Sequence, residues 1–258
     1  MKKVLIGTSG YDYPEWKGVF YPEKLPRKDF LTYYSTQLNA LELNNTFYGM
    51  PTKQRIESYI ERSEERLYFS IKVPKIFTHE YTSSWKSSAA ELKAALSPMI
   101  EKGLLASLLF QFSESFVYSP ENRIYLSKLL EEFTDFHCVV EFRNQGWGTA
   151  SVFEGLVVRN VSVAFPDMPQ IIKTNVKELS SFIGPEAYGR LHVRQNTAWY
   201  SDSEEDRYWY SENELKKFLP GINLAISEGR RCQFFFNNDP NGTGIRNALY
   251  LRELVKIL

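Results

Sequence analysis

The chain has few of the residues that most often carry metal or redox chemistry. Its 258 residues include two cysteines and three histidines. Cys138 and Cys232 lie far apart in predicted strands, so we expect two buried, reduced thiols, as is typical of a cytoplasmic protein. His79, His137 and His192 show no metal-ligand spacing, and no sequence signal favours a carboxylate-held magnesium ion. The sequence therefore predicts no metal site and no cofactor.

The sequence also lacks a charge excess, long hydrophobic runs and linkers. Its 31 basic and 31 acidic residues cancel, which disfavours a nonspecific nucleic-acid-binding protein but leaves room for a local basic patch. The first apolar run ends at Gly7, too early for a signal peptide, and no segment has the apolar length that crosses a bilayer. We expect residues 1–258 to form one cytoplasmic domain with no membrane partner, and no feature indicates an oligomeric state.

What the sequence does contain is a regular alternation of strand-like and helix-length segments. This order is typical of a parallel sheet covered by helices, and the length suits one eight-stranded barrel. A doubly wound open sheet is the alternative, but no glycine-rich phosphate loop follows the first strand. The sequence therefore predicts an α/β fold, a single (β/α)8 TIM-type barrel. The expected strands are residues 4–7, 40–46, 67–73, 104–112, 137–143, 161–165, 188–194 and 231–237.

Helix start signals support this order. Thr52 is the predicted N-cap of a helix over 53–62, and Ser119 with Pro120 is predicted to open a helix through 133. An irregular helix is expected after the sixth strand, near residues 176–182. The other expected helices cover 28–38, 88–102, 151–159, a stretch ending at 226, and 244–257.

Six of the expected strands have one apolar and one polar face. Side chains alternate across a strand, and in a barrel the apolar face meets the helices, so the polar face points into the lumen. A charge in a dry interior costs several kcal/mol unless it is paired or hydrated. The lumen charges are therefore paired, hydrated or reserved for a ligand. The predicted lumen residues are Glu42, Asn44, Ser70, Lys72, Ser107, Gln111, Glu141, Arg143, His192, Arg194, Asn237 and Asp239.

Four of these residues are candidates for catalysis. Glu42 and Glu141 suit proton transfer, but each could instead neutralise a cation such as Lys72 or Arg143, and both roles can hold together. A Schiff base on Lys72 would need a lowered pKa. Nearby glutamates should instead stabilise its ammonium group, so a charged contact to substrate is favoured. His192 suits proton transfer or a structural hydrogen bond equally well.

The remaining lumen residues are candidates for ligand binding. Arg143 and Arg194 suit bidentate recognition of carboxylate or phosphate, with internal ion pairs as the alternative. Asn44, Gln111, Asn237 and Asp239 would orient a ligand. All five tryptophans follow predicted strands, so Tyr11 and Trp16 could form part of an aromatic wall. The alternative is that such rings only anchor long loops.

The chain resembles the YecE-like family, catalogued as domain of unknown function 72. The resemblance covers nearly the whole chain and implies a barrel of the triosephosphate-isomerase type with no established reaction. Two positions differ from the family pattern: Asn144 stands where the family often has His, and Val193 where it often has Gly. The stretches that carry the resemblance are residues 7–11, Trp16, 20–22, 42–48, 69–74, 109–112, 140–143, 190–192, 236–239 and 247–248.

These observations favour an enzyme that acts on a small polar, anionic or sugar-like metabolite at the C-terminal face of the barrel. One alternative is an endonuclease-like or other nucleic-acid-binding barrel, against which the neutral net charge counts. Another is a non-catalytic barrel that binds a small molecule without converting it.

Overall fold

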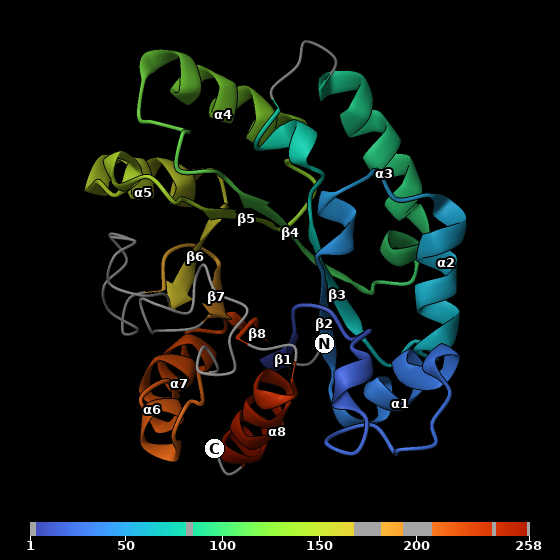
Figure 1. Cartoon of the computed structure of the whole chain (residues 1–258). Coiled ribbons are helices and arrows are strands. Elements are labelled where there is room, and N and C mark those ends of the chain that lie inside the picture. The colour runs from blue at the N-terminus through green and yellow to red at the C-terminus, as the bar shows by residue number, and fades with distance from the viewer. Residues whose placement is uncertain (1–3, 81–84, 168–181, 193–207, 239–240, 257–258) are drawn as a thin grey trace.

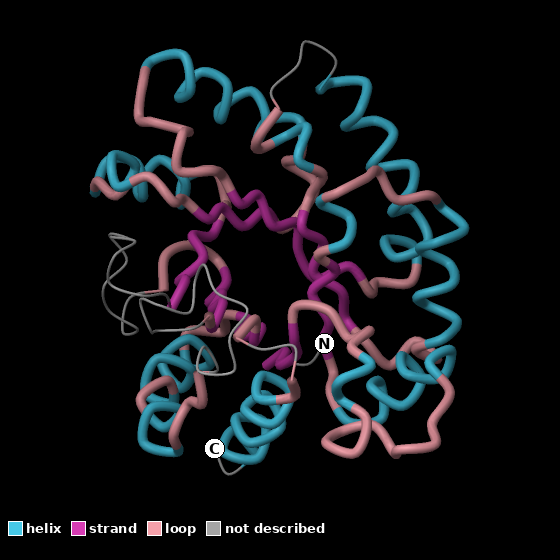
Figure 2. The backbone as a smooth tube through the Cα atoms, in the orientation of Figure 1, coloured by secondary structure: helices cyan, strands magenta, loops and turns pink. Residues whose placement is uncertain are grey.

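The chain folds into a barrel of eight parallel strands with helices around the outside (Figures 1 and 2). The computed structural model describes residues 4–80, 85–167, 182–192, 208–238 and 241–256. The strand order β1-β8-β7-β6-β5-β4-β3-β2 confirms the predicted TIM-type barrel. The strands are β1 (Val4–Thr8), β2 (Ala40–Leu43), β3 (Tyr68–Lys72), β4 (Leu105–Gln111), β5 (Cys138–Glu141), β6 (Ser162–Asp167), β7 (Glu186–Leu191) and β8 (Arg231–Phe236).

The helices begin largely where their capping residues predict. The side chain of Thr52 accepts a hydrogen bond from the backbone of Arg55. Ser119 caps the helix that begins at Pro120 in the same way. The expected helix ending at 226 is two helices, because Pro220 cannot continue a helix from the preceding turn. The expected helix near 176–182 lies almost wholly outside the described residues. The helices are α1 (Phe30–Gln37), α2 (Lys53–Arg62), α3 (Trp85–Glu101), α4 (Pro120–Glu132), α5 (Ala150–Val158), α6 (Glu212–Lys216), α7 (Leu219–Ser227) and α8 (Thr243–Lys256).

The two faces of the strands build two separate cores, as their alternation predicts. Leu41, Ile71 and Phe110 belong to the large core between strands and helices. A smaller apolar core fills the lower lumen, as is usual for this fold. It consists of Leu5, Ala40, Ala106, Leu109, Val139, Ala164, Tyr188 and Phe235.

A chain of hydrogen bonds runs through the lumen beside this small core. The hydroxyl of Ser107 lies 3.0 Å from the side-chain oxygen of Gln233 and 3.0 Å from the hydroxyl of Ser70. Ser70 in turn lies 2.7 Å from the Tyr188 hydroxyl, which donates to Glu42 at 2.8 Å. Every link is buried, so the chain satisfies polar groups that would otherwise be costly in the interior.

Side chains, rather than a backbone ladder, join β1 to β2. The Asn39 side chain bonds the backbone of β1 at Val4 and at its third residue, with distances of 2.9 and 2.8 Å. The Tyr34 hydroxyl accepts from the Thr8 amide at 2.9 Å and donates to the Ala40 carbonyl at 3.0 Å. A Cβ on Gly7 would lie 2.1 Å from that same carbonyl, so only glycine fits this seam.

Candidate functional site

A buried arginine organises the polar end of the lumen. Arg190 of β7 is 1% exposed, and its guanidinium group forms an ion pair with the carboxylate of Glu42 on β2. Its Nε lies 3.2 and 3.0 Å from the two carboxylate oxygens, and its Nη2 lies 2.8 Å from Oε1. Ser9 and Tyr188 also donate to Glu42. Because these donors occupy the carboxylate, Glu42 is better suited to fix Arg190 than to exchange protons.

Glu141 of β5 joins Arg190 to a second arginine. Its Oε2 lies 2.9 Å from Nη1 of Arg190, and its Oε1 lies 2.5 Å from Nη2 of Arg143. Burial alone raises the pKa of a carboxyl, but Arg143 and Arg190 outweigh it and hold the pKa of Glu141 far below its ordinary value. Glu141 therefore stays ionised near neutral pH, and this disfavours a general-acid role.

His192 is a buried, neutral imidazole. Burial, followed by the charges of Arg190 and Arg143, lowers its pKa well below the ordinary value. Its Nε2 lies 3.4 Å from Nη1 of Arg190. Its Nδ1 lies 3.3 Å from Nδ2 of Asn237. Both partners are donors and a neutral imidazole has one acceptor nitrogen, so the ring can accept from only one of them.

Lys72, the last residue of β3, stands apart from these ion pairs. Its ammonium lies 4.2 Å from the ring centroid of Phe47, which also packs against the His79 ring at 4.8 Å. Within the described part of the chain no hydrogen bond or ion pair involves its amine. Burial and then the charge of Arg190 lower the pKa of Lys72 to about 8, although Glu141 opposes them.

The lowered pKa differs from the expectation that nearby glutamates keep the Lys72 ammonium charged. Glu141 and Glu42 do raise its pKa, but burial and then Arg190 outweigh them. Both carboxylates also pair directly with arginine. The sequence reasoning weighed Lys72 and Arg143 as partners of the glutamates and omitted Arg190 from the site. The signal was available, because Arg190 lies two residues before His192 and so shares its face of the strand.

The cluster carries more positive than negative charge. Lys72, Arg143 and Arg190 supply three cations, and Glu42 and Glu141 supply two carboxylates. With His192 neutral, the charges of the described members of the cluster sum to one positive charge. Arg143 and Lys72 are the partly exposed members, so the excess faces the side from which a ligand would enter. Such an arrangement attracts an anion.

Other predicted lumen residues surround this cluster in different ways. Gln111 ends β4 beside Glu141 in the strand register and is half-buried. Asn44 follows β2, and its side-chain oxygen is buried with no hydrogen-bond partner within the described residues. Asn237 is exposed and contacts His192. Arg194 and Asp239 lie outside the described residues.

The two predicted aromatic contacts are elsewhere. The Tyr11 ring is 7% exposed and packs 6.4 Å from the ring of Tyr59 on α2, in the layer between strands and helices. Trp16 is 1% exposed and packs against Tyr21 and its neighbours. Their assignment to a ligand-binding wall is therefore corrected to loop anchoring. Alternation orients strand residues, but it does not orient side chains in loops.

The same anchoring applies to Trp147. Its indole nitrogen donates to the Phe116 carbonyl at 2.6 Å, and its ring stacks on Phe142 at 4.7 Å. Asn144, the position that differs from the family pattern, caps the short turn before it and donates to the Glu114 carbonyl at 3.0 Å. These residues hold the loop after β5 in place.

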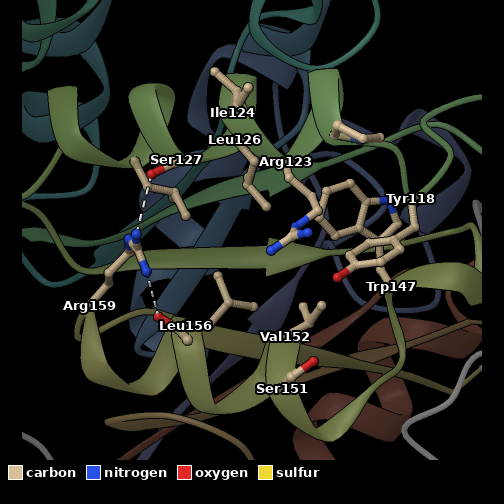
Figure 3. Close-up of a pocket in the computed structure, with 13 residues that line it drawn as sticks. Tyr118, Arg123, Ile124, Leu126, Ser127, Trp147, Ser151, Val152, Leu156 and Arg159 are labelled. Atoms are coloured by element: carbon tan, nitrogen blue, oxygen red, sulfur yellow. Dashed lines mark hydrogen bonds between the residues drawn. The ribbon is translucent and has the colours of Figure 1, made fainter.

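A second hollow lies on the outer surface, between α4 and α5 (Figure 3). It has a volume of about 490 Å³. Arg159 crosses it from the end of α5 to the hydroxyl of Ser127 at 3.3 Å, and Arg123 lies over the Tyr118 ring. Its walls come from helices and a loop, so it shares no residue with the lumen cluster.

Within the described part of the chain, no group of three or more His, Cys, Asp or Glu side chains is placed to hold a metal ion. None of the described helices is both long and apolar enough to span a bilayer.

The fold and the lumen cluster together define a TIM-type barrel with a buried, cation-rich site at the carboxyl ends of its strands. The chain belongs to the family described as "Protein of unknown function DUF72", whose model matches residues 5–258. It is similar to the UPF0759 protein YunF of Bacillus subtilis (strain 168), with 26% identity over 272 residues, 98% of this chain and 95% of that protein.

Two solved structures resemble the fold over almost their whole length. The DUF72 family protein TM1631 of Thermotoga maritima MSB8 has a TM-score of 0.85 and 28% identity, over 99% of this chain and 100% of that one. The DUF72 family protein EF0366 of Enterococcus faecalis V583 has a TM-score of 0.81 and 22% identity, over 99% and 98%. These likenesses establish family and fold, and none names a reaction.

Proposed function

We propose that this protein is an enzyme that acts on a small anionic metabolite at the C-terminal face of its barrel. Arg143 and Lys72 would contact the anion. Lys72 would also exchange a proton with the substrate or donate an electron pair to it. The charge of Arg190 would help to lower the pKa of Lys72. Glu42 and Glu141 would position the arginines, and His192 would accept or donate a hydrogen bond as a neutral ring.

One observation carries this proposal: among the described residues, both carboxylates of the cluster are already paired with arginines, and Lys72 is a third cation without an ion pair. A balanced cluster would need no further partner, whereas an uncompensated charge in a partly buried site favours an ion of opposite sign. A lysine whose pKa is lowered by burial and by a neighbouring cation is also typical of catalytic sites.

Calorimetric titration with sulfate, inorganic phosphate and small carboxylates tests the proposal. Arg143→Gln and Lys72→Met should each weaken binding at least about tenfold, since a hydrogen bond to a charged group is worth about 1.5–3 kcal/mol. Lys75→Met is the matched control, because Lys75 is a more exposed lysine nearby that already pairs with Glu80 at 2.6 Å. Equal affinities in all four proteins would refute the anion site.

Mass spectrometry of small molecules that copurify with the protein separates the alternatives. A bound anion that is released chemically unchanged under every condition would favour a non-catalytic ligand-binding barrel. Salt-sensitive binding of DNA would favour the nucleic-acid hypothesis instead. Loss of the copurifying molecule in Arg143→Gln would assign it to this site.

A further inference from the structure

We infer that Lys72 is a nucleophile whose amine condenses with the carbonyl carbon of an anionic aldehyde or oxo acid. This inference rests on the proposed anion site and names its substrate class. The anionic group of the compound would lie against Arg143, and its carbonyl carbon would lie at Nζ of Lys72.

The surroundings of Lys72 differ from those of the paired lysines elsewhere in the structure. Lys75 pairs with Glu80, and Lys93 pairs with Glu132, each at 2.6 Å. A carboxylate at that distance keeps an amine protonated and occupies the direction from which it would attack. Lys72 has no such partner within the described residues, and its immediate neighbour is the Phe47 ring. No described carboxylate therefore holds its amine protonated.

Burial, together with the charge of Arg190, keeps part of the Lys72 population neutral. Burial and Arg190 lower the pKa of Lys72 to about 8. At pH 7 roughly a tenth of its side chains are then uncharged, on the order of 300 times the share of an ordinary lysine. A neighbouring cation and a desolvated pocket are the two known ways to activate a lysine for imine formation. Here the same site contains both.

The condensation balances without any further reagent. The neutral amine attacks the carbonyl carbon, a C–N bond forms, and the oxygen takes a proton to give a carbinolamine. Water then leaves as the nitrogen lone pair forms the C=N bond. Overall a protonated lysine and a carbonyl compound give a protonated imine and one water molecule, with no net change in protons.

An anion at Arg143 and a carbonyl at Lys72 point to compact substrates. Arg143 is the second residue after β5, and Lys72 is the last residue of β3. An oxo acid or a phosphorylated aldehyde has both groups within a few bonds. A neutral aldehyde lacks the charge that the cluster favours, so the inference predicts discrimination against it.

Trapping with glyoxylate and cyanoborohydride tests the inference on the intact protein. Glyoxylate is the smallest anionic aldehyde, and hydride addition to its imine leaves a carboxymethyl group on the lysine. Peptide mass spectrometry should find Lys72 labelled at least about tenfold faster than Lys75. Acetaldehyde, the neutral counterpart, should label Lys72 more slowly than glyoxylate does. Arg143→Gln should remove that difference, and Lys72→Arg should remove the label.

The pH dependence gives a second readout. The rate of labelling at Lys72 should rise up to its pKa of about 8 and then level off. If glyoxylate binds in calorimetry but Lys72 is labelled no faster than Lys75, the inference is overturned and the anion site stands. If neither binding nor preferential labelling occurs, both are overturned. Equal labelling by acetaldehyde and glyoxylate overturns the anionic substrate class.

Discussion

The two ends of the barrel lumen each hold a buried ion cluster, and the two clusters differ in charge. At the N-terminal end, Glu186 pairs with Arg231, accepts a hydrogen bond from Gln233, and lies 3.6 Å from His137. One carboxylate and one arginine cancel there. At the C-terminal end, three cations face two carboxylates, and Lys72 is left without an ion pair within the described residues.

This contrast separates a structural cluster from a candidate functional one. Both clusters are buried, both contain arginine and glutamate, and the hydrogen bonds through Gln233, Ser107 and Ser70 connect them. Burial and pairing alone therefore do not identify a site. The distinguishing property is the unbalanced charge at the end of the barrel where such enzymes place their chemistry.

The largest expected effect comes from removing Arg190, which organises the charged cluster at the C-terminal end of the lumen. Arg190→Met leaves Glu42 and part of Glu141 buried without compensation, so we expect a loss of about 3–5 kcal/mol in the free energy of unfolding. Denaturant titration measures it. Arg27→Met, at an exposed arginine paired with Asp12, should leave stability unchanged. A small effect of Arg190→Met would mean that the carboxylates find other partners.

A pH-dependent effect is expected at Lys72. Its folded-state pKa of about 8 lies below the ordinary 10.5, so the unfolded chain binds more protons between these values and stability rises with pH across this window. Lys72→Met should therefore be more stable than the unmodified protein below pH 8. The difference in the free energy of unfolding is at most about 3 kcal/mol, and solvent screening of the partly exposed amine reduces it. The gap should close toward pH 10.5. Unfolding at pH 7 and pH 10 checks it, and a gap independent of pH would contradict the lowered pKa.

The smallest effect is expected at the cluster around Glu186, at the N-terminal end of the lumen. Arg231→Met removes the partner of Glu186 and a hydrogen bond to the Ala106 carbonyl. Gln233 remains bonded to the carboxylate, so we expect a loss of only about 1–2 kcal/mol. Anion binding at the other end should not change. Weaker anion binding in this variant would show that the two clusters act as one.

Much of this arrangement follows from the sequence. Strand alternation placed Glu42, Glu141 and His192 in one lumen, because the rule depends only on neighbours along a strand. The partner of each carboxylate did not follow, since Arg190 reaches Glu42 across a barrel whose closure brings β7 and β2 together. The pKa of Lys72 is lowered by its burial and then by Arg190, and strand alternation alone reveals neither, so its direction did not follow from the sequence. Tyr11 was misplaced because no periodicity governs a loop.

The seam between β1 and β2 has a consequence for when the site exists. Ser9, directly after β1, donates to Glu42 on β2, and the Ser9 and Glu42 backbones form the only bridge between these strands in the described residues. The carboxylate of Glu42 therefore aligns Arg190 and also helps to join β1 to β2. A chain whose first and second strands have not met holds Glu42 without its Ser9 donor. Closure of this seam therefore completes the hydrogen bonds of the carboxylate that holds Arg190.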